Sequence, residues 1–315
     1  MSLTAAAPGA GFRHEALLYA GEEDFLHGTE SFIRGGLAAG EPTLVVVAAP
    51  KIARLRERLG GDADRVDFAD MAGVGLNPAR IIPAWRDFVD RHAGAGRALR
   101  GIGEPIWAER DADELPECQR HEALLNVAFA GAADFWLLCP YDTTALAPDV
   151  LAEAERSHPF LSERTQARPS PAYGGLESFA EPFTAPLSQP ADAAELSFDA
   201  GGLEAVRALV SRSAARAGLA LDQIAEAVMA ANEVATNSVR HGGGAGRLRV
   251  WTEAGALVCE VGDAGRMADP MSDRERPGAD PDARRGLWLV NHLCDLVQIR
   301  SVAGGTVVRM RIRRR

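Results

Sequence analysis

The sequence predicts an α/β protein of two domains. The N-terminal domain is expected to hold a mostly parallel sheet with helices on both faces, and the C-terminal domain a two-layer α+β sandwich. The chain has 315 residues, about twice a common domain length. A proline-rich segment, residues 162–195, separates two regions whose apolar patterns differ. We therefore expect domains at 1–161 and 196–315, joined by a semi-rigid linker.

Short apolar runs alternate with amphipathic helical patterns in residues 1–161. The expected strands are Leu44–Ala48, Val66–Phe68, Leu99–Ile102 and Phe135–Cys139, and the expected helices are Glu23–Ala39, Lys51–Leu59, Pro78–Ala93 and Pro116–Ala130. Strands that alternate with helices predict a parallel sheet whose connecting helices cover both faces.

In residues 196–315 the expected helices and strands follow a different order. The expected order is two helices (202–217 and 222–241), two strands (248–253 and 257–262), a short helix (286–294) and two further strands (296–301 and 306–312). The short loops within each strand pair favour antiparallel hairpins. The helices would then pack on one face of the sheet.

The composition limits the kinds of partner. Apolar residues make up 47% of the chain, enough for two cores. A net charge of −10 and a pI near 5.3 argue against DNA or RNA as the main partner, because nucleic-acid binders usually carry a basic surface. The arginine-rich end, Arg309–Arg315, alternates apolar and basic residues. This pattern predicts a half-buried strand with a solvated outer face, and a docking edge for an acidic protein is the alternative.

We expect a cytoplasmic protein without a membrane segment. Residues 1–11 lack the basic start and apolar core of a signal peptide, and apolar runs such as Leu44–Ala49 are too short to span a bilayer. The four cysteines are Cys118, Cys139, Cys259 and Cys294. Their spacing predicts neither a zinc pattern nor a disulfide framework, and it suits a reducing compartment.

The second C-terminal helix carries candidate chemistry on its polar face. Apolar residues at three- and four-residue steps from Ile224 to Val239 form one stripe. Glu233, Asn237 and His241 follow one another at steps of four on the opposite face. A solvated polar face would explain these residues on the helix alone, so the segments that follow decide the interpretation.

Three later segments point to an anion or nucleotide site. The strand ending at Asp263-Ala264-Gly265 runs into an irregular charged segment, Arg266–Arg284, of a length that is often an active-site lid. Arg285-Gly286-Leu287 then opens a helix, and free amide groups at such a start can bind phosphate. Gly304-Gly305-Thr306 begins the last strand.

These motifs, in this order and spacing, resemble the GHKL ATPase fold, and the runs Glu233–Gly242 and Gly286–Asn291 most resemble its anti-sigma-factor serine/threonine kinases. The resemblance implies ATP and Mg²⁺ as cofactors. It implies Glu233 as the catalytic base, Asn237 as the Mg²⁺ ligand, Asp263 with Gly265 and Thr306 at the adenine, and Arg285, Gly286 and Leu287 at the phosphates. His241 either shapes the phosphate side or caps the helix end. The family often has a second glycine where this chain has Met267, and its lid usually has more glycines than Gly286.

The N-terminal region resembles the MEDS domain of sensors from methylotrophs and methanogens. The matching runs are His14–Tyr19, Arg100–Pro105, Trp107, His121–Asn126 and Leu138–Asp142. The resemblance implies that a small organic ligand binds here, and the candidate sensory residues are His14, Arg100, Glu104, Trp107, Glu122, Asn126 and Tyr141. A salt-bridged docking domain without a ligand is an equal alternative. Gly35–Gly40 lacks a lysine and precedes a strand, so it is not expected to bind ATP.

The leading hypothesis is a Mg-ATP-dependent kinase that phosphorylates a STAS-domain anti-sigma-factor antagonist, binds a sigma factor and is regulated by its N-terminal domain. The alternatives are a non-catalytic ATP-binding module and an atypical histidine kinase. His121-Glu122 invites the latter, but the expected proline and helical hairpin are absent. Since related kinases are commonly dimers, a homodimer stays open.

Overall fold

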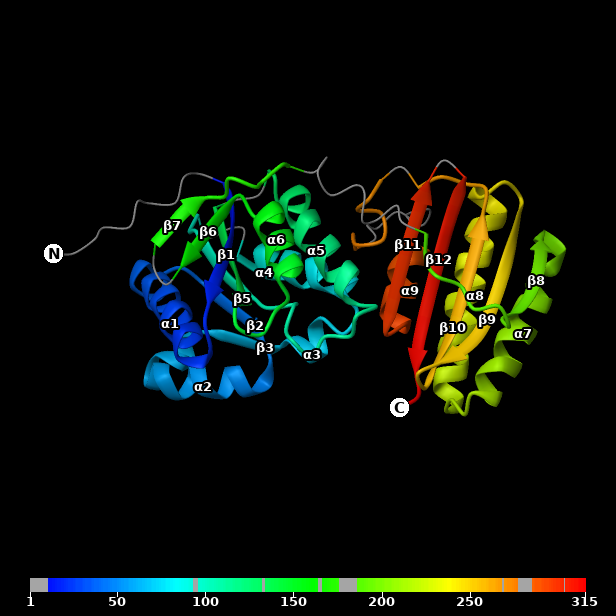
Figure 1. Ribbon diagram of the computed structural model, residues 1–315, viewed down its shortest axis with the longest axis horizontal. Coiled ribbons are helices and arrows are strands. Elements are labelled where there is room, and N and C mark those ends of the chain that lie inside the picture. Colours follow the sequence, from blue (N-terminus) through cyan, green and yellow to red (C-terminus); the bar gives the residue numbers. More distant parts are fainter. Residues whose placement is uncertain are drawn as a thin grey trace. The chain divides into compact units, whose positions relative to one another are not determined.

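The protein folds into two compact units, Met1–Phe179 and Ala180–Arg315. The computed structural model describes residues 11–92, 96–131, 134–163, 166–175, 186–267, 269–276, 285–302 and 304–315. Figure 1 shows the helices and strands of each unit. None of the helices in these ranges is both long and apolar enough to cross a membrane.

The first unit is a seven-stranded sheet with helices. Its strands are β1 (Phe12–Tyr19), β2 (Thr43–Val47), β3 (Asp67–Asp70), β4 (Leu99–Gly103), β5 (Phe135–Asp142), β6 (Phe160–Glu163) and β7 (Gln166–Pro169). Its helices are α1 (Glu22–Ala39), α2 (Ala49–Leu59), α3 (Met71–Val74), α4 (Ile81–His92), α5 (Leu115–Ala128) and α6 (Pro148–Ser157). The strand order is β3-β2-β4-β5-β1-β6-β7, and every pairing is parallel except β6 with β7.

Both faces of this sheet are covered, as two consecutive residues of β5 show. Trp136 stacks edge-on against Phe32 of α1. Phe135, which points the other way, contacts Trp85 and Phe88 of α4. Because successive strand side chains alternate between faces, α1 and α4 lie on opposite sides. The predicted mostly parallel sheet with helices is therefore confirmed.

Five of the strands and α-helices of the first unit lie outside the expected set. They are β1, α3, α6, β6 and β7. Strand β7 falls inside the segment expected to be a linker, and it pairs antiparallel with β6 at the edge of the sheet. Part of the proline-rich segment thus belongs to the first unit.

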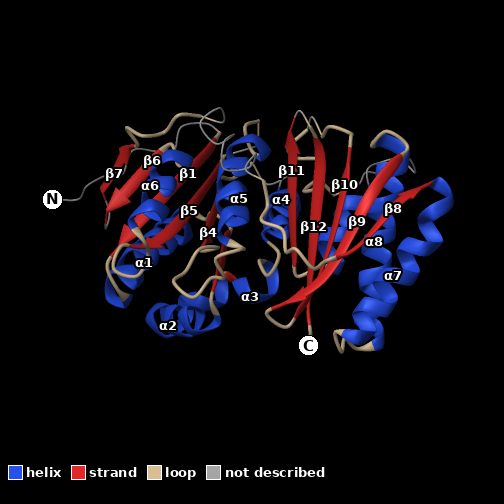
Figure 2. Cartoon of the chain, turned by 45° about the vertical axis from the view of Figure 1, so that its right-hand side comes forward, coloured by secondary structure: helices blue, strands red, loops and turns tan. Residues whose placement is uncertain are grey.

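The second unit is a five-stranded antiparallel sheet with helices on one face (Figure 2). Its strands are β8 (Ala194–Asp199), β9 (Ala245–Glu253), β10 (Ala256–Asp263), β11 (Leu296–Val302) and β12 (Gly305–Arg313), and its helices are α7 (Leu203–Arg216), α8 (Leu221–His241) and α9 (Arg285–Leu293). The order is β11-β12-β10-β9-β8. The predicted two-layer sandwich is confirmed, with β8 as an edge strand that was not foreseen.

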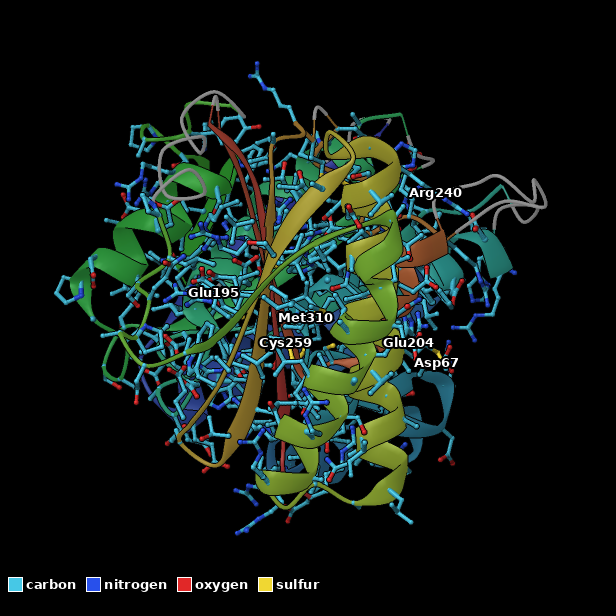
Figure 3. The ribbon with its side chains drawn as sticks, turned by 90° about the vertical axis from the view of Figure 1, so that its right-hand side faces the viewer. Asp67, Glu195, Glu204, Arg240, Cys259 and Met310 are labelled. Atoms are coloured by element: carbon cyan, nitrogen blue, oxygen red, sulfur yellow. The ribbon has the colours of Figure 1, made fainter. Side chains whose placement is uncertain are left out.

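One apolar core lies between this sheet and its helices. Val210 of α7, Ala231 of α8 and Val290 of α9 share it with residues of every long strand. Cys259 and Met310, which are register partners on β10 and β12, lie side by side in it (Figure 3). The predicted apolar stripe of α8 is therefore its core-facing side.

The outer face of β12 differs from the expectation of a solvated surface. Arg309 and Arg311 are only 6% and 5% exposed. The Arg309 guanidinium donates to Glu260 Oε2 at 2.6 and 2.9 Å and to the carbonyl of Ser188 at 2.6 Å. Arg311 pairs with Glu253. The expectation was wrong because carboxylates on β10 and β9 pair with these arginines and offset the cost of their burial.

Candidate functional site

The polar face of α8 meets the first turn of α9. Glu233 and Asn237 are half-buried on α8. A methyl group in place of the hydrogen of Gly286 would lie 3.2 Å from Glu233 Oε2 and 3.1 Å from Asn237 Nδ2. The start of α9 therefore lies close to both side chains, and a Cβ at Gly286 would displace them slightly. The first amide groups of a helix lack partners within it, so they are available to an anion at this place.

The carboxylate of Asp263 is held at the end of β10. The Ser238 hydroxyl of α8 donates to Oδ2 at 2.6 Å, and the Gly265 amide donates to Oδ1 at 2.8 Å. Gly242, just after α8, has no room for a side chain, because a Cβ there would lie 2.4 Å from Asp263 Cγ. Each carboxylate oxygen has a second lone pair, so Asp263 keeps capacity to accept from a ligand.

A chain of hydrogen bonds continues from Gly265 to the last two strands. Thr306 Oγ1 donates to the Gly265 carbonyl at 2.9 Å and lies 2.9 Å from Ser301 Oγ. Ser301 Oγ in turn accepts from the Met267 amide at 2.8 Å. Thr306 therefore helps to hold Gly265, whose amide donates to Asp263, and so supports the position of the Asp263 carboxylate indirectly.

Three other predicted residues have different surroundings. His241 is exposed at the end of α8. Leu287 is partly buried against the core of the second unit. The side chain of Arg285 lies outside the described residues. Phosphate contacts of Arg285 and His241 stay predictions.

The segment predicted as a lid is described in part. Residues 268 and 277–284 lie outside the described ranges. In 269–276, the Met271 amide donates to Asp269 Oδ1 at 2.9 Å, and Asn291 of α9 donates through Nδ2 to the Asp273 carbonyl at 2.7 Å. The described part of this segment is therefore tied to α9.

Sequence reasoning missed several residues that build the site. Ser238 was given no role, although it follows Asn237 directly and holds Asp263. Gly242 and Ser301 were also missed. Gly242 allows a close approach of two backbone segments, and Ser301 bridges two strands through its hydroxyl. Neither role leaves a spacing pattern in the sequence, so only the folded structure reveals them.

The candidate sensory residues of the first unit lie in several places. Arg100 pairs with Glu41 and donates to the Phe32 carbonyl at 2.7 Å. Glu104 accepts from Tyr19 Oη at 2.8 Å and from Lys51 Nζ at 2.5 Å. Trp107 lies under the Arg110 guanidinium, 4.6 Å away. Salt bridges at Arg100 and Glu104 are what the ligand-free alternative expects.

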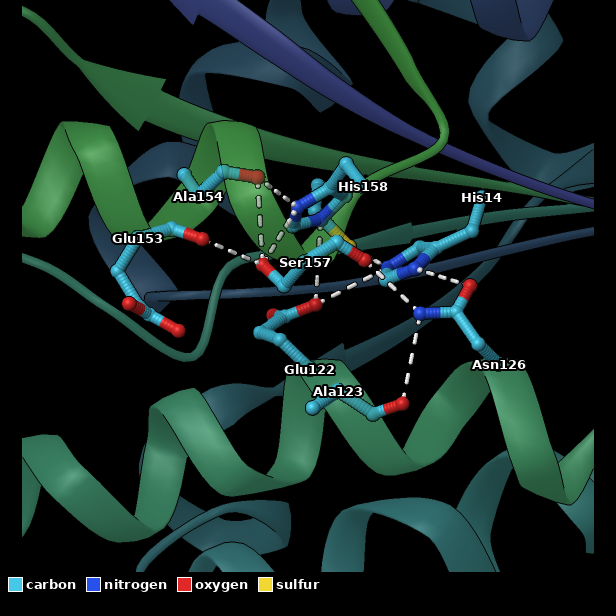
Figure 4. A network of polar contacts seen from close by, with 9 residues as sticks. His14, Glu122, Ala123, Asn126, Glu153, Ala154, Ser157 and His158 are labelled. Carbon is cyan, nitrogen blue, oxygen red and sulfur yellow. Dashed lines mark hydrogen bonds and ion pairs between the residues drawn. The ribbon is translucent and has the colours of Figure 1, made fainter. Parts of the chain in front are cut away.

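His14, Glu122 and Asn126 do come together in the first unit (Figure 4). His14 Nε2 lies 3.1 Å from Glu122 Oε2, and His14 Nδ1 lies 3.2 Å from Asn126 Oδ1. His158, which was not predicted, also faces Glu122, and Tyr141 packs edge-on against its ring. Burial lowers the pKa of His14 to about 4.

The fold and site define a two-domain protein in which a parallel-sheet domain precedes an ATPase-type sandwich. Residues 13–159 match the MEDS family, the methanogen/methylotroph, DcmR sensory domain, and residues 196–312 match the histidine kinase-like ATPase domain. The chain thus carries an N-terminal MEDS domain and a C-terminal histidine kinase-like ATPase domain. The resemblances to the MEDS domain and to the ATPase fold are confirmed, and the anti-sigma-factor kinase branch stays a prediction.

Among solved structures, the chain matches the crystal structure of the RsbU and RsbW domains of Rv1364c from Mycobacterium tuberculosis. The identity is 22% and the TM-score 0.31, over 39% of this chain and 33% of that one. The match thus spans a third of the length of that chain. No curated protein matches the chain significantly.

Proposed function

We propose that this protein is a Mg-ATP-dependent kinase that phosphorylates a serine or threonine of a STAS-domain anti-sigma-factor antagonist. One observation carries the proposal: Glu233 and Asn237 of α8 lie beside the first turn of α9 at Gly286. A carboxylate, an amide oxygen and free helix amides then converge at one place. These are the groups that phosphoryl transfer needs for positioning and charge stabilisation.

The residues present fit ATP and Mg²⁺. Because Gly286 has no side chain, the space beside Asn237 is wider than a Cβ at this position would leave it. Asn237 would hold Mg²⁺ through its amide oxygen, a ligand type that this hard cation accepts, and the first turn of α9 would bind phosphate. Asp263 would accept from the adenine amino group, with its orientation set by Ser238 and Gly265. Bound Mg²⁺ would neutralise charge on the phosphates.

Glu233 distinguishes a kinase from a simple nucleotide-binding module. Binding needs no base, whereas transfer is helped by a carboxylate that accepts or orients the proton of the attacking hydroxyl. Glu233 is half-buried within a few ångströms of the space at Gly286, so its carboxylate faces the same place as Asn237. This arrangement supports a catalytic role.

The test is transfer from labelled ATP to a purified STAS-domain partner. We expect Glu233→Gln to lower transfer by about 100-fold or more, because a general base contributes roughly that factor, and to leave ATP affinity within about twofold. Glu204→Gln is the matched control, since Glu204 is an exposed glutamate on the neighbouring helix α7 (Figure 3). ATP binding without transfer would indicate the non-catalytic module. Acid-labile label on the chain itself would indicate a histidine kinase, although His121 is buried.

The same proposal covers regulation and partners. The ATPase-type domain would bind a sigma factor, which places the protein in the cytoplasm, and the MEDS domain would regulate it in response to a small organic ligand or a partner. A homodimer stays open, because related kinases are commonly dimers. Transfer rates of the full chain, measured with and without candidate small organic compounds, test the regulation.

A further inference from the structure

Four buried side chains from distant parts of the first unit converge on one point. They are His14 on β1, Glu122 on α5, Cys139 on β5 and His158 just after α6, and none is more than 1% exposed. One ligand atom from each lies within 4.8 Å of all the others. A buried group of imidazoles, carboxylate and thiol needs a specific reason, because such side chains are costly to remove from water.

Three of the six distances between these atoms are close to those of a tetrahedral metal site. Glu122 Oε2 lies 3.1 Å from His14 Nε2 and 3.3 Å from His158 Nε2, and Cys139 Sγ lies 3.4 Å from His14 Nε2. Zinc bonds to nitrogen, oxygen and sulfur imply ligand-to-ligand distances of about 3.3–3.8 Å. Small shifts of the side chains would therefore complete the coordination.

Hydrogen bonds outside the group fix how both histidines face it. Asn126 donates through Nδ2 to the Ser157 carbonyl at 2.8 Å, so its Oδ1 is the atom that meets His14 Nδ1 (Figure 4). His158 Nδ1 lies 2.8 Å from the Ala154 carbonyl. Each Nδ1 must then carry a proton, so each imidazole in its neutral form turns an Nε2 lone pair toward Glu122. Metal-bound histidines show the same pattern of outer hydrogen bonds.

The centre of the group therefore has too few hydrogen atoms. Two Nε2 lone pairs and a carboxylate oxygen face one another, and the Cys139 thiol is the hydrogen donor that the described residues supply. Glu122 Oε1 and His158 Nε2 are buried without a hydrogen-bond partner among those residues. A cation would resolve the clash of acceptors. A divalent ion with one carboxylate, one thiolate and two neutral imidazoles gives a site with no net charge.

We propose that His14, Glu122, Cys139 and His158 bind one Zn²⁺ ion in a closed structural site of the MEDS domain. Imidazole and thiolate ligands disfavour Mg²⁺ and Ca²⁺, and four protein ligands leave no open position for catalysis. The Cys139 thiol releases its proton to water when the ion binds. The site ties α5 and the end of α6 to the middle of the sheet. The cysteine spacing gave no zinc pattern, because the ligands lie 17 to 144 positions apart along the chain.

Cobalt substitution of the full-length protein tests the site. The protein is stripped with a chelator and titrated with Co²⁺, which gives a visible ligand-field spectrum in four-coordinate sites and a near-ultraviolet charge-transfer band when a thiolate is bound. We expect both signals to saturate at one equivalent and to disappear when Zn²⁺ is added. Zinc should also raise the Tm of the first unit by about 5 °C or more, because it binds only the folded state.

Two cysteine variants separate this site from other metal binding. Cys139→Ser should lose the charge-transfer band, whereas Cys118→Ser should keep it, since Cys118 is an equally buried thiol outside the group. Circular dichroism checks that each variant is folded. If Cys139→Ser does not fold, His158→Gln replaces it and should weaken Co²⁺ binding at least tenfold. An unchanged band in a folded Cys139→Ser protein, or no stoichiometric Co²⁺ uptake by the stripped wild type, overturns the proposal.

Discussion

Ser238 is a single hydroxyl that fixes the carboxylate proposed to recognise adenine. It donates to Asp263 Oδ2 at 2.6 Å. We expect Ser238→Ala to weaken ATP binding by about fivefold, which corresponds to about 1 kcal/mol for one such hydrogen bond. Thr236→Ala is the matched control, because the Thr236 hydroxyl donates to the Asn232 carbonyl of its own helix. Isothermal titration with ATP measures both variants. Equal losses in the two would show that the Asp263 contact is irrelevant to affinity.

Gly304 and Gly305, at the start of β12, should differ sharply in how well they tolerate a side chain. Gly305 has a φ of +131°, and a Cβ there would lie 2.1 Å from the Asp263 carbonyl oxygen. Gly304 has open space around it. We expect Gly305→Ala to lower the free energy of unfolding by about 2–5 kcal/mol through strain and overlap, and Gly304→Ala to change it by less than about 0.5 kcal/mol. Urea denaturation compares them, and similar values would contradict the close approach of β12 to Asp263.

Single residues were predictable where chemistry and spacing coincide. Glu233 and Asn237 became candidates because steps of four place them on one helix face, and Gly286 lies beside them in the structure, while their roles stay predictions. The contact of Ser238 with Asp263 joins residues 25 positions apart and follows no period. Cys139 and His158 were missed for the same reason. Their partners come from other elements, and only the folded sheet brings them together.

The packing of α9 on α8 decides whether the start of α9 can serve a phosphate. A methyl group on Gly286 would lie 3.1 Å from Asn237 Nδ2 and 3.2 Å from Glu233 Oε2. Both atoms end flexible side chains, so Gly286→Ala should cost little stability, within about 1 kcal/mol. It should lower phosphoryl transfer at least tenfold by displacing the two groups that act there. Paired kinetics and urea denaturation check this. Full transfer activity would remove the α8–α9 junction from the site.

Elements whose apolar residues recur at a regular helical or strand spacing were predicted, and the elements that were missed lack such a spacing. Helices α1, α8 and α9 follow their apolar stripes. Strand β1 was missed because it buries the polar pair His14 and Glu15. Glu15 is satisfied there by Arg13 Nε at 2.9 Å and Trp136 Nε1 at 3.1 Å. Hydropathy cannot mark a strand whose burial depends on partners from elsewhere in the chain.

At the scale of the whole molecule, two domains could be predicted from composition, but their edges could not. Proline density suggested a linker over 162–195, yet β7 (Gln166–Pro169) joins the first sheet. At the other end, β8 begins at Ala194. Extended segments with prolines look alike whether or not they pair at a sheet edge, because edge strands tolerate proline.

Residues 188–195 should therefore be part of the folded C-terminal domain. The Ser188 carbonyl accepts from Arg309 at 2.6 Å, Gln189 donates to Glu260 at 2.7 Å, and the Pro190 carbonyl accepts from Arg249 at 2.8 Å. Each bond involves a charged partner, and such bonds contribute about 1.5–3 kcal/mol. We expect fragment 186–315 to be more stable than fragment 196–315 by at least about 2 kcal/mol.

Fragment 191–315 separates the contribution of residues 188–190 from that of the first residues of β8. It lacks the three hydrogen bonds of residues 188–190, but it keeps all of β8 and the ion pairs of Glu195 with Arg247 and Arg249. Urea denaturation should place its stability between the other two. ATP binding should be the same in all folded fragments, since Asp263, Asn237 and α9 are untouched. If all three fragments unfold at the same urea concentration, the segment before β8 is a linker after all, and Arg309, Glu260 and Arg249 are satisfied without it.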